Sequence, residues 1–414
     1  MGRKIVFTIV AKNYLPLARA LGWSLKNNNS TDVDFIIFLA DGDDLAESGE
    51  TIVPVATLGI KNLDDLAFKY SITEFCTSVK PTCFKHIFKD SDVESAIYFD
   101  PDIFVFNDLQ SIYSDLAIKD IVVTPHYHSK QSEHMGDQSD MITLFVGIYN
   151  FGFVAFNNSA ANISILDWWE DRLTNQCYAD KQDALHTDQK WADFFPVYAK
   201  DRLHISPSRG YNFAPWNIFE RKVSLVNDKF VVTDRFTGQS DPLTFVHFAG
   251  YAPESPEVIH KDFWDMGIEK YPEYTLVRDI YDKITAQFDF LEKRKSPYLY
   301  AEYTNGVYIH EYHRRLYRAL TESGTVIVNP FNSDGWFFQL LLKKKMITGS
   351  RPSKQNSKTL NDFDGKLNKI NKMLKILFKV LGADKYFLFL KFLNRYTRPE
   401  NQVFLLDEKR TKIY

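Results

Sequence analysis

The stretch Ser95-Ala-Ile-Tyr-Phe-Asp-Pro-Asp-Ile-Phe-Val-Phe106 sets two carboxylates, Asp100 and Asp102, between two short apolar runs. The runs are rich in β-branched and aromatic residues, which predicts a strand on each side of an acidic turn. Carboxylates placed between buried strands need a counter-charge or a metal. Oxygen ligands of this kind suit Mg²⁺ or Mn²⁺ bridging a diphosphate. The alternative interpretation is a solvated acidic turn, since D-x-D also occurs by chance.

The residues before this stretch predict alternating strands and helices. Residues 4–10 form a β-branched and aromatic run, a polar turn follows at Ala11-Lys-Asn-Tyr14, and residues 15–25 have helical apolar spacing. Residues 33–39 are a second apolar run, which ends in an acidic turn at residues 41–44. This alternation predicts an α/β domain with a mainly parallel sheet. Ligands of such sheets bind beyond the carboxyl ends of the strands, so both turns are candidate binding positions.

Hydrophobic spacing assigns further elements along the chain. We expect strands at residues 52–58, 121–125 and 146–157, and helices at residues 72–88 and 262–290. The acidic pair would then lie at a strand end within an α/β arrangement, where a bound ligand is expected.

Four motifs occur in order between residues 98 and 250. They are Tyr98-Phe-Asp-Pro-Asp-Ile-Phe-Val105, Asn150-Phe-Gly-Phe-Val-Ala-Phe-Asn157, Thr187-Asp-Gln189 and Val246-His-Phe-Ala-Gly250. Together they resemble the D-x-D-I-x-V, N-x-G, D-Q and H-F-x-G segments of glycosyltransferase family 8, whose members have the GT-A fold. The resemblance covers roughly residues 4–250. It implies an α/β, GT-A (Rossmann-like) domain with a mainly parallel mixed sheet, followed by a helical C-terminal region.

The resemblance implies that Asp100, Asp102 and His247 bind a divalent cation, Mn²⁺ or Mg²⁺, that grips the diphosphate. A neutral imidazole beside two carboxylates is a sensible ligand set for Mn²⁺. A lone histidine is otherwise most often a core residue hydrogen-bonded to the backbone. The adjoining Phe-Ala-Gly favours the ligand interpretation, because Gly250 lets the backbone approach a phosphate closely.

The resemblance also implies a donor-binding set and two residues at the reacting face. Asp188 and Gln189 are the predicted catalytic residues, which would touch the hydroxyls of the sugar. Alternatively, Asp188 is a helix N-cap, Asn150 and Gly152 form a strand-edge turn, and Lys80 is a solvated lysine at a helix end. The residues predicted to bind the donor are Ala11, Lys12, Asn13, Tyr14, Lys80, Asp100, Asn150, Gly152 and Gly250.

One departure from the family pattern concerns the diphosphate. In the family, H-F-x-G is usually followed by Lys-Pro-Trp, whereas Gly250 is followed here by Tyr-Ala-Pro-Glu-Ser. Either the metal and backbone amides suffice, or Arg209, Lys12 or Arg221 supplies the positive charge. Residues 208–217 have loop composition and could line the acceptor side of the site, although an ordinary buried loop has the same composition.

Family 8 members retain the anomeric configuration of the sugar, so the resemblance implies retention. The leaving phosphate oxygen would then take the acceptor proton, while the cation stabilises the charge that grows on the diphosphate. An inverting enzyme would instead need a carboxylate as general base, for which Asp188 or Asp137 are candidates. The predicted reaction moves a hexose-type sugar from a nucleoside diphosphate, foremost a UDP-sugar, to a glycan or lipid-linked glycan.

Charge is divided unevenly along the chain. Residues 343–414 hold 18 Lys and Arg against 6 Asp and Glu, whereas the preceding residues hold 32 against 47. Lysines alternate with apolar clusters in this tail, which is typical of a helix on an anionic membrane surface. A terminal helix that packs on the acidic body would have the same composition. A nucleic-acid partner is not expected, because no binding motif accompanies the basic segment.

The sequence predicts three parts and a location. Residues 1–255 are the expected nucleotide-sugar-binding catalytic domain, residues 256–350 a mainly helical extension that completes the acceptor side, and residues 351–414 a basic amphipathic tail. No run of about twenty apolar residues occurs, and the N-terminal residues do not resemble a signal peptide. We therefore expect a cytoplasmic protein, with peripheral contact to the inner face of the cell membrane as an option for the tail.

Two other functions are compatible with parts of the sequence. A nucleotidyl- or phosphoryl-transferring enzyme also uses paired aspartates and Mg²⁺. It would be expected to carry a glycine-rich phosphate loop after the first strand, and the turn Ala11-Lys-Asn-Tyr14 contains no glycine. A non-catalytic carbohydrate-binding protein could use its aromatic residues, 15% of the chain, as sugar-stacking faces.

Overall fold

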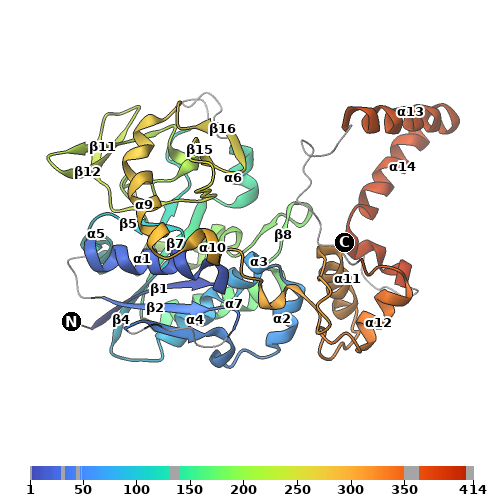
Figure 1. The fold of residues 1–414 in the computed structure, drawn as a ribbon, viewed down its shortest axis with the longest axis horizontal. Coiled ribbons are helices and arrows are strands. Elements are labelled where there is room, and N and C mark those ends of the chain that lie inside the picture. The colour runs from blue at the N-terminus through green and yellow to red at the C-terminus, as the bar shows by residue number, and fades with distance from the viewer. Residues whose placement is uncertain are drawn as a thin grey trace. The chain divides into compact units, whose positions relative to one another are not determined.

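The structure is a computed structural model that describes residues 2–28, 33–42, 47, 49–130, 140–348 and 363–406 (Figure 1). Contacts between residues divide the chain into two compact units. Unit 1 comprises Met1–Lys61 and Ile72–Tyr298, and unit 2 comprises Asn62–Ser71 and Leu299–Tyr414. The sequence analysis divided the chain by expected function, at residues 1–255, 256–350 and 351–414. That division stays a prediction.

A seven-stranded mixed sheet forms the centre of unit 1 (Figure 1). In order across the sheet, its strands are β10 (Leu203–Ile205), β6 (Ile121–Pro125), β7 (Tyr149–Asn157), β4 (Val93–Phe99), β1 (Arg3–Val10), β2 (Asp34–Leu39) and β3 (Thr51–Pro54). Neighbouring strands are parallel except where β7 pairs antiparallel with β4 and β6. This arrangement confirms the predicted α/β class with a mainly parallel mixed sheet.

Shorter strands pair outside this sheet. They are β5 (Ile103–Val105) with β14 (Phe245–His247), β8 (Ala179–Asp180) with β9 (Leu185–His186), β15 (Val258–His260) with β16 (Phe263–Gly267), and the three strands β11 (Arg221–Val226), β12 (Lys229–Asp234) and β13 (Ser240–Pro242). All of these pairs are antiparallel. The pairing of β5 with β14 matters most, because it joins two segments that carry predicted metal ligands.

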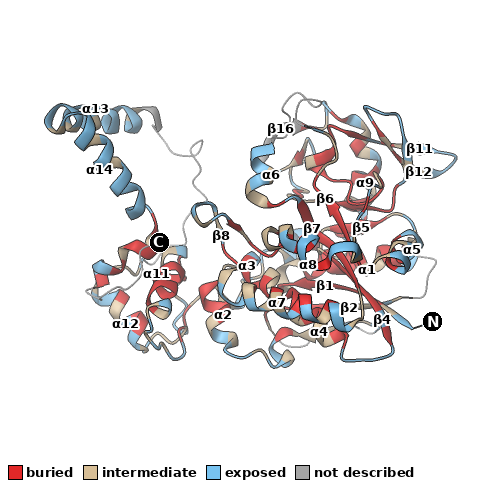
Figure 2. Cartoon of the chain, turned by 180° about the vertical axis from the view of Figure 1, so that it is seen from behind, coloured by how far each residue is buried: buried red, intermediate tan, exposed pale blue. Residues whose placement is uncertain are grey.

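Helices cover both faces of the seven-stranded sheet. The helices of unit 1 are α1 (Leu15–Asn28), α3 (Ile72–Ser78), α4 (Lys80–Ile87), α5 (Gln110–Ile118), α6 (Asp140–Val146), α7 (Ala160–Gln176), α8 (Phe195–Ala199), α9 (Thr275–Gln287) and α10 (Phe290–Lys293). Val6 of β1 shares a core cluster with Leu21 of α1 and Ile112 of α5. The next residue, Phe7, faces the other way and lies 4.7 Å from the ring of Phe84 in α4. Figure 2 shows the buried strands of this sheet in red.

Two expected elements near the site differ in their limits. The helix expected at residues 72–88 is divided into α3 and α4, because Pro81 lies in the first turn of α4, where proline is tolerated. The strand expected from residue 146 begins at Tyr149. Helix α6 and then Gly147, whose φ is +109°, precede it.

Two further expectations are partly wrong. The strand expected at residues 52–58 ends at Pro54, and a 3₁₀ turn, η2 (Val55–Leu58), follows it. The helix expected at residues 262–290 begins only at Thr275, because β16 and a turn precede α9. A strand as short as β16 carries too few residues to produce a readable alternation.

Unit 2 is a small helical core. It contains α2 (Leu63–Lys69), α11 (Glu311–Glu322), α12 (Trp336–Lys343) and the 3₁₀ segment η10 (Pro399–Leu406). Phe68, Leu316, Phe337 and Val403 lie in its hydrophobic cluster. Helices α13 (Phe363–Leu381) and α14 (Ala383–Tyr396) come before η10 in the chain. Among the described residues, none of the helices has the length and apolar content that crossing a membrane requires.

Candidate active site

Three side chains of the kind that bind metal ions lie close together, near the end of β4, the start of β5 and the end of β14. Asp100 and Asp102 lie in the turn between β4 and β5, and His247 is the last residue of β14. Antiparallel pairing places His247 opposite Ile103, and the N–H of Phe248 donates to the Asp102 carbonyl at 2.8 Å. One ligand atom of each of the three side chains lies within 4.8 Å of the others. The structure thus brings together the residues predicted to bind metal.

The three side chains interact electrostatically. Nε2 of His247 lies 3.1 Å from Oδ1 of Asp102 and 3.7 Å from Oδ2 of Asp100. Burial raises the pKa of Asp100 above its usual range. Burial also disfavours the ionised form of Asp102, but the charge and hydrogen bond of His247 outweigh it and lower the pKa of Asp102. Asp102 likewise raises the pKa of His247 against the effect of burial. The carboxylates therefore favour a positive charge between them, which a bound cation would provide.

Lys80 and Asp188 form a buried ion pair beside this cluster. Nζ of Lys80 contacts Oδ2 of Asp188, donates to the Phe151 carbonyl at 2.7 Å, and lies 3.9 Å from the centroid of the Tyr98 ring. The Tyr98 hydroxyl donates in turn to Oδ1 of Asp100. Lys80 and Asp188 are 1% and 2% exposed. Lys80 is therefore not a solvated lysine, and Asp188 does not cap the following turn with its side chain.

Gln189 and Asp188 are held against β7. Gln189 begins the 3₁₀ segment η5 (Gln189–Phe194). Its Nε2 donates to the Val146 carbonyl at 2.8 Å, and its Oε1 accepts from the N–H of Phe151 at 3.4 Å. Nε1 of Trp169 donates to the Asp188 carbonyl at 3.2 Å. Both predicted catalytic residues are thus fixed by hydrogen bonds from neighbouring elements.

Strand β7 passes next to His247 at Gly152. A Cβ atom on Gly152 would lie 2.3 Å from Cε1 of His247, so a glycine is required at this contact. Oδ1 of Asn150 accepts from the N–H of Gly152 at 3.2 Å and from Nδ2 of Asn212 at 3.1 Å. Nδ1 of His247 is buried and has no hydrogen-bond partner within the described part of the chain. The other ring nitrogen, Nε2, is the one that faces the two aspartates.

The turn after β1 is fixed by an aspartate that follows β2. Asp41 is buried and accepts from the N–H of Lys12 at 2.7 Å, which holds the 3₁₀ turn η1 (Lys12–Tyr14) and the preceding Ala11 in place. Oδ1 of Asn13 is buried, and no described residue bonds to it. Burial raises the pKa of Tyr14, and the charge of Asp102 adds to this rise. The Asp102 charge therefore reaches the turn predicted to bind the donor. Residues 43 and 44 of the acidic turn lie outside the described residues.

A hairpin turn that the sequence did not connect to the site packs against Gly250. Gly250 has a φ of +68°, and a Cβ atom on it would lie 2.3 Å from the ring of His260. The N–H of Lys261 donates to the Gly250 carbonyl at 3.1 Å. After His247, the charge of Lys261 also contributes to lowering the pKa of Asp102. Burial lowers the pKa of His260 to about 4, so this histidine is neutral near pH 7. Lys261, which the sequence did not assign to the site, is thus a basic residue whose backbone is bonded to Gly250.

The arginines considered for the diphosphate are engaged in other contacts. Nε of Arg209 donates to Asp234 at 2.7 Å, and Nε of the buried Arg221 donates to Glu220 at 3.0 Å. Lys12 is partly exposed in the η1 turn. Asp137, the other carboxylate considered as a general base, lies outside the described residues.

Trp216 brings the segment at residues 208–217 to His247, one of the three clustered side chains. It lies in the 3₁₀ turn η7 (Pro215–Asn217), and its ring centroid is 5.0 Å from that of His247 and 5.6 Å from that of His126. Its Nε1 is buried, and no described residue accepts a hydrogen bond from it. The indole ring of Trp216 is thus the part of this segment that packs against His247.

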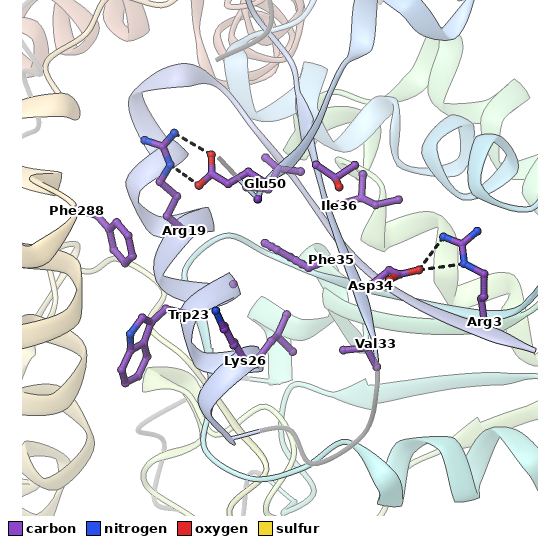
Figure 3. Close-up of a pocket in the computed structure, with 15 residues that line it drawn as sticks. Arg3, Arg19, Trp23, Lys26, Val33, Asp34, Phe35, Ile36, Glu50 and Phe288 are labelled. Atoms are coloured by element: carbon purple, nitrogen blue, oxygen red, sulfur yellow. Dashed lines mark hydrogen bonds and ion pairs between the residues drawn. The ribbon is translucent and has the colours of Figure 1, made fainter. Parts of the chain in front are cut away.

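A separate pocket of about 820 Å³ lies between α1 and β2 (Figure 3). Arg19 pairs there with Glu50 at 2.8 Å, and Arg3 pairs with Asp34 at 2.7 Å. None of the residues that the sequence predicts for the site is among its described lining residues. These charged side chains bind each other in ion pairs, and the pocket has no group of ligand-type side chains like Asp100, Asp102 and His247 among its described lining residues.

Comparison with known proteins gives remote similarities. No family model matches the chain. The uncharacterized protein YfnF of Bacillus subtilis (strain 168) is 25% identical over 256 residues, which make up 59% of this chain and 80% of that protein. Among solved structures, the chain is similar to the galactosyltransferase LgtC in complex with donor and acceptor sugar analogs, with 16% identity over 69% of this chain and 95% of that chain and a TM-score of 0.43. It is also similar to mouse xyloside xylosyltransferase 1, with 11% identity over 59% of this chain and 97% of that chain and a TM-score of 0.38.

Proposed function

We propose that the protein is a GT-A glycosyltransferase that moves a hexose-type sugar from a nucleoside diphosphate, foremost a UDP-sugar, to a glycan or lipid-linked glycan. The observation that carries this proposal is the convergence of Asp100, Asp102 and His247 beside the carboxyl end of β4. Carboxylate oxygens and an imidazole nitrogen suit Mn²⁺ or Mg²⁺. The four ordered motifs support the same conclusion, because they include all three of these residues.

In this proposal the chain's own residues bind and orient the donor. A bound cation supplies Lewis-acid stabilisation of the charge on the leaving diphosphate. Asp100, Asp102 and His247 hold that cation. Asn13 offers an unsatisfied oxygen from the η1 turn, and Lys261 adds a positive charge near Gly250. Asp188 and Gln189, fixed by Lys80 and β7, orient the sugar.

We propose that transfer occurs with retention of the anomeric configuration. An inverting enzyme needs a carboxylate free to take the acceptor proton. Asp188 is almost fully buried, and its carboxylate is bound by Lys80. Both oxygens of this carboxylate are engaged, one by Lys80 and the other by the Thr187 hydroxyl, so it is not open to an acceptor hydroxyl. The leaving phosphate oxygen is then the better acceptor for the proton.

Metal-dependent nucleotide binding is the first expected result. UDP should bind the full chain in the presence of Mn²⁺, and removal of Mn²⁺ should weaken binding by about tenfold or more, measured by isothermal titration calorimetry. A protein that only binds carbohydrate would show no metal-dependent affinity for the nucleotide. A screen of nucleotide sugars for Mn²⁺-dependent hydrolysis then identifies a glycosyltransferase, which releases UDP and free sugar. A parallel assay with nucleoside triphosphates identifies a nucleotidyltransferase, which releases pyrophosphate.

Lys261→Gln is expected to raise the KM for the donor by about tenfold, because a hydrogen bond to a charged group contributes about 1.5 to 3 kcal/mol. The measurement is initial rate against donor concentration. Lys222→Gln is the matched control, since Lys222 is an exposed lysine on β11. Equal KM values for the two variants would remove Lys261 from the proposed donor site.

The acceptor and the location are the remaining parts of the proposal. Trp216 and the segment at residues 208–217 would face a glycan acceptor, because this segment carries an unsatisfied donor next to His247. The reaction would take place in the cytoplasm, with a lipid-linked acceptor presented at the inner face of the cell membrane. Surface-polysaccharide assembly, in capsule or lipopolysaccharide, is the process that such a reaction would serve.

A further inference from the structure

Helices α13 and α14 form a continuous pair near the C-terminal end of the chain. Gly382 joins them with a φ of +73°, its N–H donates to the Phe378 carbonyl at 2.9 Å, and the N–H of Tyr386 donates to the Gly382 carbonyl at 3.0 Å. The rings of Phe378 and Tyr386 lie 5.3 Å apart. We call Phe363–Leu381 and Ala383–Tyr396 together the tail helix pair.

The tail helix pair exposes a large apolar surface. None of its described side chains is buried, and Figure 2 shows both helices mostly in the colour of exposed residues. Seven of its large apolar side chains are 51–75% exposed, namely Ile370, Met373, Ile376, Val380, Phe387, Leu388 and Phe392. A contiguous exposed apolar surface marks a site of interaction with a partner or a membrane.

Basic residues accompany the apolar side chains, and three of the five lysines of α13 share one side of that helix. Residues 363–396 contain eight Lys and Arg against two Asp. At 100° per residue, Lys372, Lys375 and Lys379 cluster on one side of the helix. The opposite side carries Ile370, Leu374, Leu377 and Leu381, and the other two lysines, Lys366 and Lys369, lie on its flank. This division of a basic side from an apolar side is the pattern of a helix that lies in a membrane interface.

The segment that follows the pair is anchored elsewhere. Val403 and Leu406 of η10 are buried in the hydrophobic cluster of unit 2, and Glu400 of η10 accepts from Arg318 of α11 at 3.1 Å. From residue 365 onwards, the described side chains are buried only after the tail helix pair has ended. Segment η10 thus connects the tail helix pair to the folded core of unit 2. If the pair binds a surface, unit 2 is held close to that surface.

We propose that the tail helix pair binds the surface of an anionic lipid bilayer, with its apolar side chains among the acyl chains and its lysines against the phosphate headgroups. Charge complementarity selects this occupant, because a second copy of the pair would carry the same positive charge and repel the first. The inference does not depend on glycosyl transfer, since it rests on unit 2 alone.

Vesicle sedimentation with the full chain tests the proposal. The protein should bind vesicles of phosphatidylcholine with about one third phosphatidylglycerol at least about tenfold more strongly than vesicles of phosphatidylcholine alone, and added salt should weaken this preference. The triple variant Lys372→Gln, Lys375→Gln, Lys379→Gln should lose most of the preference for anionic vesicles. The triple variant Phe387→Ser, Leu388→Ser, Phe392→Ser should lose binding to both vesicle types.

A matched control separates the tail helix pair from exposed apolar residues in general. Leu225 and Val226 are each 50% exposed on β11, and their replacement by serine should leave vesicle binding unchanged. Circular dichroism verifies that all variants are folded. Failure of the unaltered protein to prefer anionic vesicles would overturn the proposal. Lipid-free self-association that the Phe387→Ser, Leu388→Ser, Phe392→Ser variant abolishes would also overturn it, because a second copy would then be the occupant.

Discussion

Asp102→Asn is expected to abolish sugar transfer while leaving the chain folded. Asparagine keeps the shape of the side chain but removes the charge that would hold the cation. Loss of Lewis-acid stabilisation costs several kcal/mol in the transition state, which corresponds to a fall in turnover of roughly a thousandfold or more. The measurement is Mn²⁺-dependent release of UDP from the donor that the hydrolysis screen identifies.

The folded state should tolerate this change. Asp102 and Asp100 are like charges close to one another, so removal of one charge relieves repulsion and offsets the weakened contact with His247. The melting temperature is therefore expected to stay within about 5 °C of that of the unaltered protein. Asp279→Asn is the control, because Asp279 is exposed on α9 and should affect neither quantity. Turnover by Asp102→Asn near the unaltered rate would contradict the metal-binding role.

The local parts of the fold and site could be predicted from the sequence. The stretch around Asp100 and Asp102 carries its own pattern, since the apolar runs on both sides predict the strands that the structure contains. The turn at Ala11-Lys-Asn-Tyr14 follows a strong strand signal for the same reason. These features depend on neighbours in the sequence, and hydrophobic alternation reports such neighbours directly.

Contacts between distant segments could not be derived in this way. Only the family resemblance suggested that His247 joins the two aspartates, because the pairing of β14 with β5 leaves no trace in either three-residue strand. Lys80 was predicted to bind the donor and Asp188 to be catalytic, but no pattern indicated that they bind each other. Lys261 was missed because β15 and β16 are short, and helical spacing was read over part of their hairpin.

Gly152→Ala is expected to weaken Mn²⁺ binding by about 10- to 100-fold, the effect typical of a change that disturbs the orientation of a metal ligand. The new methyl group would lie 2.3 Å from Cε1 and 2.7 Å from Nδ1 of His247, and 2.9 Å from Oδ1 of Asn150. Real Cβ contacts essentially never fall below 3.0 Å. His247 must therefore move, and its Nε2 would leave its place near Asp100 and Asp102. Calorimetric titration of Mn²⁺ in the presence of UDP measures the loss.

Gly238→Ala separates this displacement from a general loss of stability. Gly238 has a φ of +73°, and no described atom lies within 4 Å of the position that a Cβ atom would take, so alanine there strains the backbone without touching the site. That strain should cost about 1 to 2 kcal/mol, comparable to the roughly 1 to 3 kcal/mol expected for the crowded Gly152→Ala. If both variants lower the melting temperature but only Gly152→Ala weakens Mn²⁺ binding, the effect belongs to His247. Equal Mn²⁺ affinities in the two variants would mean that His247 does not bind the cation, since it could then be displaced without consequence.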